Sequence, residues 1–248
     1  MSEVGELFNH IVKFVLKIDP PRRHLAIKFL DNYYFSRNYR KYGARAWGQI
    51  KIITNKYKNI LILPVVAVDD VENSSGQVAV YELMNYHNAK IPNNILQRKD
   101  PFKEAACLKK CDYILYVDDF VGSGNQFIKM YNNTKKYIGN RKVGLYSFVI
   151  QELGLDAIIK TGVELYYHTM RKRAISDGFG IGDLDPHQAM ADYMAIEALV
   201  EVPKGRTLGD RQMEALVTMK RTPNSTLPIF WCTGAKGGGQ WPAPFIRT

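Results

Sequence analysis

Two adjacent acids followed by a small-residue loop are the residues best suited to chemistry. Residues 113–126 have the sequence YILYVDDFVGSGNQ, in which an apolar run leads into Asp118 and Asp119 and then into Gly122–Gly124. Carboxylates accept hydrogen bonds from vicinal sugar hydroxyls, and loop amides at a helix N-terminus bind a phosphate. Glycines let the backbone approach such an anion closely, and Ser123 adds a hydroxyl. This pattern predicts a site for a ribose 5-phosphate group.

The elements around these residues alternate between strand and helix. The apolar pattern predicts a buried strand over 113–117, a loop over 118–124 and a helix over 125–138. Further elements are predicted by the same criteria: strands over 59–68, 142–150 and 163–168, and helices over 78–87 and 153–160. This alternation is typical of an α/β fold with a mainly parallel sheet and helices on both faces. Ligands bind such sheets at the carboxyl ends of the strands.

The two ends of the chain lack this alternation. Helical spacing predicts helices over 3–17, 23–34 and 38–57, so that residues 1–57 form a helical N-terminal cap. The core then covers residues 58–169, and residues 170–248 form an irregular C-terminal cap and tail. Within that cap we expect helices over 188–200, opened by Asp185 and Pro186, and over 206–219. The tryptophans of the tail, Trp231 and Trp241, are expected to pack against the protein rather than to stack on a base.

The chain is strongly basic, with a formal charge of +10 and a pI near 9.4. Such a charge favours a polyanionic partner, which leaves a nucleotide, a nucleic acid or another phosphate-bearing ligand open. The basic residues form local clusters at 37–45, 135–142 and 171–173, and each is expected to be a solvated surface.

Composition also limits the cellular setting. The 46% of hydrophobic residues are spread along the chain, without the roughly 18 uncharged residues in a row that a membrane helix needs. The polar, acidic start lacks the features of a secretory signal, so we expect a cytoplasmic protein. Cys107, Cys111 and Cys232 are too few for a disulfide framework or a four-ligand zinc site, and we expect buried thiols.

The segment from Tyr113 to Gln126 resembles the phosphoribosyl pyrophosphate motif of type I phosphoribosyltransferases. In that family an apolar strand, two acids and a Thr-Gly-type loop follow one another. The resemblance implies the type I phosphoribosyltransferase fold, with Asp118 and Asp119 at the ribose 2- and 3-hydroxyls and at Mg²⁺. It places around the 5-phosphate the residues Val121, Gly122, Ser123, Gly124, Asn125 and Gln126. The family's loop usually ends in a hydroxyl residue, where this sequence has Asn125 or Gln126.

The same resemblance implies two further elements. A pyrophosphate loop follows an earlier strand in the family, and here the loop 69–76 ends in Ser74, Ser75 and Gly76. Its acids Asp69, Asp70 and Glu72 leave a metal site or a solvated turn open. The stretch 88–102 takes the place of a flexible lid whose Lys90, Arg98 and Lys99 would neutralise pyrophosphate, the alternative being an ordinary basic loop.

The caps and the tail resemble phosphoribosyltransferase-like proteins of bacterial conflict systems, which act as anti-phage effectors. If the protein is an enzyme, the resemblance implies phosphoribosyl transfer, a glycosyltransferase reaction, to an acceptor that the sequence does not identify. The implied partners are a phosphorylated ribose or nucleotide, with a nucleic acid, a defence-system protein and a homo-oligomer left open.

Two other classes remain open. A non-catalytic nucleotide or nucleic-acid binder on the same fold would use the same site without turnover. A methyltransferase that uses S-adenosylmethionine is the other, because residues 119–124 also resemble the cofactor loop of amino-methyltransferases. The second motif of those enzymes is present only as Asp19-Pro20-Pro21, with Arg22 in place of the aromatic residue.

Overall fold

The computed structural model describes residues 3–66, 75–85, 95–98, 100–103 and 105–247. By their contacts the residues form two compact units. One is continuous and covers Asn38–Met170, and the other combines Met1–Arg37 with Arg171–Thr248. The continuous unit holds the sheet and also the helix α3 (Arg40–Thr54), which the sequence analysis grouped with the N-terminal cap. The predicted core boundaries 58–169 therefore stay a prediction.

The sheet of the continuous unit has five strands in the order β3-β2-β4-β5-β6. Their bounds are β2 (Ile60–Pro64), β3 (Ile95–Gln97), β4 (Tyr113–Val121), β5 (Lys142–Gln151) and β6 (Glu164–Arg171). The pairs β2–β3, β2–β4 and β4–β5 are parallel. The predicted α/β class with a mainly parallel sheet is thereby confirmed.

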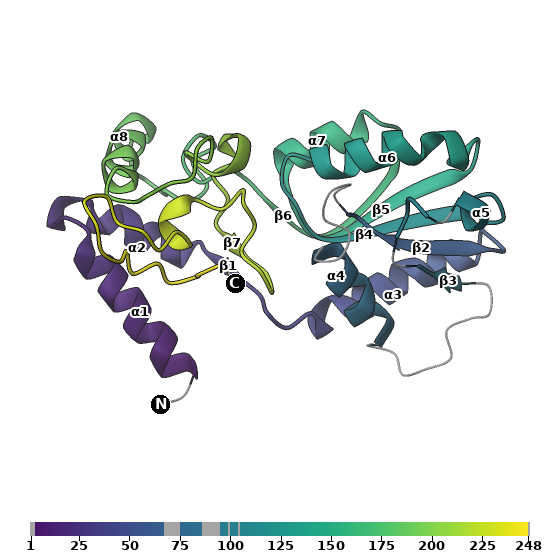
Figure 1. Cartoon of the computed structure of the whole chain (residues 1–248), viewed down its shortest axis with the longest axis horizontal. Coiled ribbons are helices and arrows are strands. Elements are labelled where there is room, and N and C mark those ends of the chain that lie inside the picture. Colours follow the sequence, from purple (N-terminus) through teal and green to yellow (C-terminus); the bar gives the residue numbers. More distant parts are fainter. Residues whose placement is uncertain (1–2, 67–74, 86–94, 99, 104, 248) are drawn as a thin grey trace. The chain divides into compact units, whose positions relative to one another are not determined.

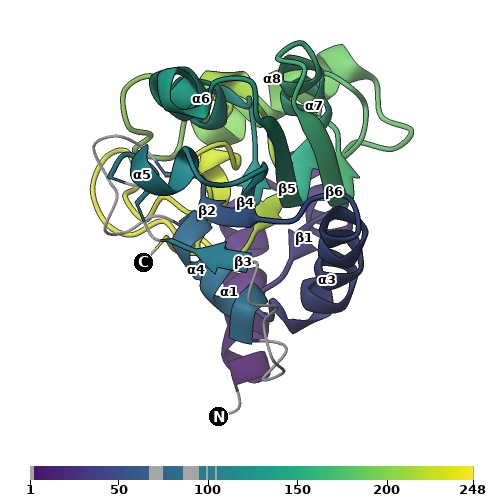
Figure 2. The same ribbon diagram turned by 90° about the vertical axis from the view of Figure 1, so that its right-hand side faces the viewer.

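Helices cover both faces of this sheet, as Figures 1 and 2 show. Helices α6 (Asn125–Ile138) and α7 (Glu152–Ile159) lie on one face, where α5 (Ala105–Leu108) also contributes to the core. Helices α3 and α4 (Ser75–Asn85) cover the other face and are joined by a hydrogen bond of 2.9 Å from Trp47 Nε1 to the Leu83 carbonyl. Because helices cover both faces, both sides of the central strand β2 are shielded from solvent, and every residue of β2 is buried and apolar.

Strands β2, β4 and β6 differ from their predicted bounds by several residues, and β3 was not predicted. Strand β4 continues through Asp118 and Asp119 to Val121, although a loop was expected from residue 118. Its extension is stabilised by pairing with β5, where Asp118 lies opposite Ser147 and Val121 opposite Ile150. Strand β2 ends at Pro64, although the backbone N–H of Val65 still donates to the Val117 carbonyl of β4 at 2.9 Å. Strand β3 was missed inside the expected loop 88–102, since its three residues give too short a pattern.

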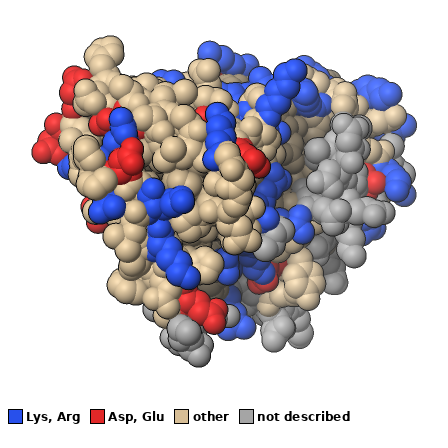
Figure 3. Space-filling view, turned by 60° about the vertical axis from the view of Figure 1, so that its left-hand side comes forward, with Lys and Arg blue, Asp and Glu red and all other residues tan. Residues whose placement is uncertain are grey.

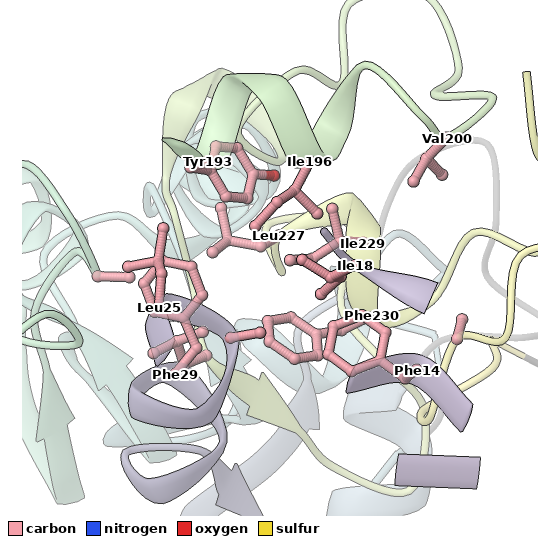
Figure 4. Close-up of a cluster of buried hydrophobic side chains, with 14 of the residues drawn as sticks. Phe14, Ile18, Leu25, Phe29, Tyr193, Ile196, Val200, Leu227, Ile229 and Phe230 are labelled. Atoms are coloured by element: carbon pink, nitrogen blue, oxygen red, sulfur yellow. The ribbon is translucent and has the colours of Figure 1, made fainter. Parts of the chain in front are cut away.

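The second unit is mainly helical and encloses its own core, part of which Figure 4 shows. Its elements are α1 (Glu3–Lys17), the 3-10 turn η1 (Pro20–Arg22), α2 (Arg23–Asp31), α8 (Pro186–Glu197), the 3-10 turn η3 (Pro228–Phe230) and the parallel pair β1 (Tyr34–Phe35) and β7 (Val217–Thr218). Phe14 of α1 packs against Phe230, with ring centroids 5.3 Å apart. Trp241 meets Phe14 edge-on and donates from Nε1 to the Ile229 carbonyl at 2.8 Å. The tail is thus part of this core, as expected for its tryptophans.

The C-terminal cap contains one correct and one wrong helix prediction. Asp185 caps α8 by accepting from Gln188 N at 2.9 Å, as the Asp-Pro pattern indicated. The helix predicted over 206–219 is absent from that described segment, which holds only the 3-10 turn η2 (Asp210–Gln212) and then β7. Positive φ angles at Leu208, Arg211, Gln212 and Glu214 are incompatible with a regular helix. The buried Glu214 carboxylate accepts from the backbone N–H groups of Ile175 and Ser176 at 2.8 Å each.

No helix among the described residues is long and apolar enough to cross a membrane. On the face drawn in Figure 3, Lys and Arg side chains lie in several separate groups, with acidic side chains between them. The positive charge on that face is therefore dispersed rather than gathered into one continuous patch.

The sheet interior offers a test of this packing. Tyr113 on β4 crosses Gly144 on β5 and donates to Glu164 on β6, with an Oη to Oε2 distance of 2.8 Å. A Cβ added at Gly144 would clash with the Tyr113 hydroxyl. Gly144→Ala should therefore lower the free energy of unfolding by about 1–3 kcal/mol, as overpacking does. The measurement is urea denaturation followed by circular dichroism.

Gly48→Ala is the matched control for this substitution. A Cβ at Gly48 in α3 meets nothing within 4 Å, so alanine should stabilise the helix by roughly 0.5–1 kcal/mol. Equal effects of the two substitutions would contradict the described packing of Tyr113 over Gly144.

Candidate functional site

The two acids of the predicted site lie at the end of β4 and are buried. Asp118 is 4% exposed and Asp119 is 2% exposed. The backbone N–H of Asp119 donates to Asp118 Oδ1 at 3.0 Å. The Asp118 side chain also interacts directly with that of Asp119, so the two carboxyl groups lie together at this end of the strand.

Tyr39 holds one of these carboxyl groups. Its hydroxyl donates to Asp119 Oδ2 at 2.5 Å, and its ring packs edge-on against Phe148 of β5 with centroids 5.1 Å apart. Tyr39 immediately precedes α3, so the start of this helix lies at the acid pair. Helical spacing predicted a helix over 38–57 that contains Tyr39, but it did not predict this contact, which joins residues 80 positions apart.

Asp118 is the electrostatically strained member of the pair. Burial and then the adjacent charge of Asp119 hold the pKa of the Asp118 carboxyl well above its usual value. A buried carboxyl group with a raised pKa is typical of functional sites, because a bound cation or hydrogen-bond donor can offset the cost of its charge.

The acid pair lies at the point where the strand order of the sheet reverses. From β2 the chain passes through α4 to β3 on one side, and from β4 it passes through α6 to β5 on the other side. Helices α4 and α6 cover opposite faces, so the two connections diverge at the carboxyl ends of β2 and β4 (Figure 1). Such a switch point is where open α/β sheets bind their ligands.

The loop after β4 and the start of α6 supply the predicted phosphate site. Gly124 occupies the N-cap position of α6 with φ 75°, a left-handed conformation that glycine adopts without strain. The first N–H groups of a helix have no partner within it and attract an anion. Asn125 Nδ2 donates to Ser123 Oγ at 2.9 Å, so these two side chains stabilise the turn together. Val121 is buried and Gln126 is exposed.

Gly154 supports this loop and was not singled out in the sequence. A Cβ at Gly154 of α7 would clash with the Gly122 carbonyl oxygen, and a Cβ at Gly124 would lie 3.2 Å from the Gly154 oxygen. The helix therefore packs backbone to backbone against the loop. The signal for it in the sequence is a glycine inside a short helix, where glycine otherwise lowers stability.

The other predicted site residues are only partly described. Ser75 and Gly76 form the first turn of α4, and a Cβ at Gly76 would clash with the Val65 oxygen beyond β2. Arg98 follows β3, is half-buried and donates its backbone N–H to the Ile62 carbonyl at 3.2 Å. The remaining residues of the predicted loop and lid lie outside the described residues: Asp69, Asp70, Glu72, Ser74, Lys90 and Lys99.

The donor set fits the magnesium ion that the sequence analysis implied. Mg²⁺ prefers oxygen ligands and is often bound by one or two carboxylates together with substrate phosphates. Asp118 and Asp119 supply such carboxylates, and the raised pKa of the Asp118 carboxyl shows that a nearby cation would relieve its environment. Within the described ranges, no three or more His, Cys, Asp or Glu side chains gather as a metal cluster. The ligand's own oxygens would therefore complete the coordination.

Two alternative motifs lie elsewhere. Asp19, Pro20 and Pro21 follow helix α1 rather than a strand, and Asp19 pairs with Arg22 at 2.8 Å. They accordingly lack the strand-end position of a methyltransferase motif. Cys107 lies in α5 and Cys111 beyond its end, both as free thiols, and burial raises the pKa of the Cys111 thiol to about 11.

An α/β sheet with an acid pair and a helix start at its switch point is the arrangement found in folds that bind nucleotides or sugar phosphates. A family model described as PRTase-CE, in which PRTase abbreviates phosphoribosyltransferase, matches residues 19–247. The chain therefore belongs to the PRTase-CE family, and its fold is of the type I phosphoribosyltransferase kind. No curated protein matches the chain.

Solved structures of phosphoribosyltransferases are distantly similar. Orotate phosphoribosyltransferase of Mycobacterium tuberculosis H37Rv in complex with inorganic phosphate has 15% identity and a TM-score of 0.31, over 46% of this chain and 60% of that one. A phosphoribosyltransferase from Corynebacterium diphtheriae has 14% identity and a TM-score of 0.33, over 50% and 76%. This chain thus spans 60% of the length of the mycobacterial enzyme. Likenesses of this size add no argument to the family match.

The strain at Asp118 predicts a pH-dependent stability. Because the folded-state pKa lies above the ordinary value of 3.8, the associated stability is fully present below that pH and is lost as pH rises through the folded pKa. Asp118→Asn should therefore stabilise the ligand-free protein at pH 7, by about 1 kcal/mol, and flatten this pH dependence. Thermal unfolding between pH 4 and pH 8 measures both effects.

The exposed Asp156 on α7 provides a control. Asp156→Asn should change stability by less than about 0.5 kcal/mol across the same range. A wild type whose stability does not fall between pH 4 and 8 relative to Asp118→Asn would show that Asp118 is not strained.

Gly154 allows the loop to be tested apart from the acids. Gly154→Ala should displace Gly122 and weaken binding of a ribose 5-phosphate ligand by about tenfold or more, with a loss of stability of roughly 1–3 kcal/mol. Calorimetric titration of the folded variant measures the first effect and urea denaturation the second. Unchanged binding would mean that the loop position does not matter to the ligand.

Proposed function

We propose that this protein binds the ribose 5-phosphate group of phosphoribosyl pyrophosphate, or of a related nucleotide, at the end of β4. The observation that carries the proposal is the juxtaposition of two buried carboxyl groups and a left-handed glycine at a helix start. Asp118 and Asp119 would accept hydrogen bonds from the ribose hydroxyls, and the backbone of residues 121–126 would bind the 5-phosphate. The family match supports this assignment.

As a transferase the protein would need no nucleophile of its own. The bond between C1 and the pyrophosphate oxygen breaks with its electron pair leaving on pyrophosphate, and a lone pair of the acceptor forms the new bond to C1. Magnesium, when bound, would neutralise the leaving pyrophosphate. That pyrophosphate would be contacted by the side chains of Ser74, Ser75, Lys90 and Arg98. The backbone of Gly76 would contact it as well. Catalysis would then consist of positioning and electrostatic stabilisation.

Non-catalytic binding is the second candidate, and one contact favours it. Asp119 is already held by Tyr39 in a buried hydrogen bond, so a ligand that reaches Asp119 also displaces or shares the Tyr39 hydroxyl. Such an exchange couples ligand binding to the start of α3, as a sensor requires. For the cellular role we propose an effector of bacterial anti-phage defence, supported by the resemblance of the caps to proteins of conflict systems.

The central test is calorimetric binding of phosphoribosyl pyrophosphate with magnesium. We expect micromolar affinity for the wild type and an affinity at least about 100-fold lower for Asp118→Asn/Asp119→Asn, because both carboxylate hydrogen bonds are weakened. Asp156→Asn is the matched control and should bind like the wild type.

Two parallel measurements separate the candidates. Release of pyrophosphate in the presence of an acceptor would establish transfer, whereas tight binding without release would establish a sensor. Binding of S-adenosylmethionine alone would overturn the proposal in favour of a methyltransferase, and binding of neither ligand would contradict any ribose-phosphate site at β4.

A further inference from the structure

A second group of polar side chains lies on the α3 face of the sheet. It consists of Arg45 of α3, Tyr146 of β5 and His168 of β6, with Lys41 one helical turn before Arg45. Arg45 Nη1 donates to the backbone carbonyl of His168 at 3.2 Å. Figure 2 shows α3 running beside β6 on this side of the sheet.

Two polar atoms of this group are buried without a hydrogen-bond partner among the described residues: Tyr146 Oη and His168 Nδ1. Tyr146 as a whole is 2% exposed. A buried hydroxyl or imidazole nitrogen without a partner is costly, so folded proteins rarely keep one unless water or a ligand completes it. Both residues feel the charge of Arg45, and each atom is a position that water or a ligand would complete.

The charges around these atoms indicate which kind of group this is. The pKa of His168 is lowered, first by burial and then by the charges of Arg45 and Lys41. Burial raises the pKa of Tyr146 to about 12, against the opposing influence of Arg45. The imidazole is therefore neutral and the phenol protonated at pH 7, so that the Tyr146 hydroxyl, the His168 ring and the Arg45 guanidinium can all donate hydrogen bonds. The potential of two cations favours an anion over a neutral acceptor.

We propose that Arg45, Tyr146 and His168 form a binding site for an oxyanion, a phosphate or carboxylate group, with Lys41 adding to its positive potential. The donors differ in kind and come from three separate elements, α3, β5 and β6. Arg45 and Lys41 are exposed and His168 is half-buried, so the group borders solvent.

This site is linked to the acid pair through α3. Tyr39 contacts Asp119, Tyr42 packs against His168 with ring centroids 4.9 Å apart, and Arg45 contacts His168. Residues 39 and 45 are six positions apart, a rise of about 9 Å along a helix. On the basis of the proposed function, the oxyanion would belong to the acceptor, because the same helix start contacts Asp119. The acceptor class is therefore an anionic molecule, with a phosphate or a carboxylate.

The test is a titration of the full chain with inorganic phosphate, and separately with acetate, at constant ionic strength. The ring resonances of His168 are followed by NMR and assigned by their absence in His168→Gln. We expect a saturable shift of these resonances and a rise in the pKa of His168, because an anion stabilises the imidazolium form. Saturation by phosphate alone or by acetate alone identifies which oxyanion the site accepts.

Two variants and one control make the test specific. Arg45→Met and Tyr146→Phe should each weaken the phosphate response by about tenfold or more, since each removes one donor. Lys51→Met removes an exposed charge near the other end of α3 and should leave the response unchanged. An equal, unsaturable response in all variants would mean that only water fills the site, and it would overturn the inference.

The outcome is separable from that of the proposed function. Asp118→Asn/Asp119→Asn should weaken binding of phosphoribosyl pyrophosphate by at least about 100-fold and keep the His168 response to phosphate. A protein that binds phosphoribosyl pyrophosphate without any His168 response refutes the oxyanion site alone, and the reverse result refutes the ribose site alone.

Discussion

The burial of two neighbouring carboxyl groups at the end of β4 is the constraint on which the rest of the sheet unit depends. Charge in a dry interior is costly, so the surroundings must supply donors or a cation. The pairing of β4 with β5 satisfies the backbone as far as Val121, and Tyr39 satisfies part of Asp119. What remains unrelieved is Asp118, and the strain persists in the absence of a ligand. Asp118 thereby lowers the stability of the ligand-free protein while it is proposed to bind the ligand.

Helix α3 connects most of what is chemically active in this unit. Its start touches Asp119 through Tyr39, its first turns hold the aromatic stack of Tyr42 on Phe148, and Arg45 reaches β6. The Tyr42 and Phe148 rings stack with centroids 4.5 Å apart and nearly parallel planes. The acid pair and the β6 edge are therefore joined by contacts of one helix and its N-cap rather than by a loop.

Much of this architecture could be predicted from local pattern. Buried strands and amphipathic helices have recognisable apolar patterns in the sequence. The limits of α6 and the parallel class of the sheet could therefore be predicted. The continuation of β4 through two acids could not be, because acids disfavour strands and only the partner β5 stabilises them there. The irregular backbone of residues 206–219 could not be predicted either, because it contains the buried Glu214, whose partner is distant in sequence. The roles of Gly154 and Tyr39 could not be predicted for the same reason, since both depend on contacts distant in sequence. Ser74 and Lys90 stay predictions.

The helical unit is assembled from both ends of the chain, whereas the sheet unit is a single uninterrupted stretch. During synthesis on a ribosome, the sheet unit can fold as soon as residue 170 has emerged, because all its strands are then present. Helices α1 and α2 emerge before the sheet unit and yet must wait for Phe230 and Trp241, which complete their core. Until then the apolar side of α1 has no permanent cover. Residues that are synthesised before the sheet unit therefore reach their final packing after it.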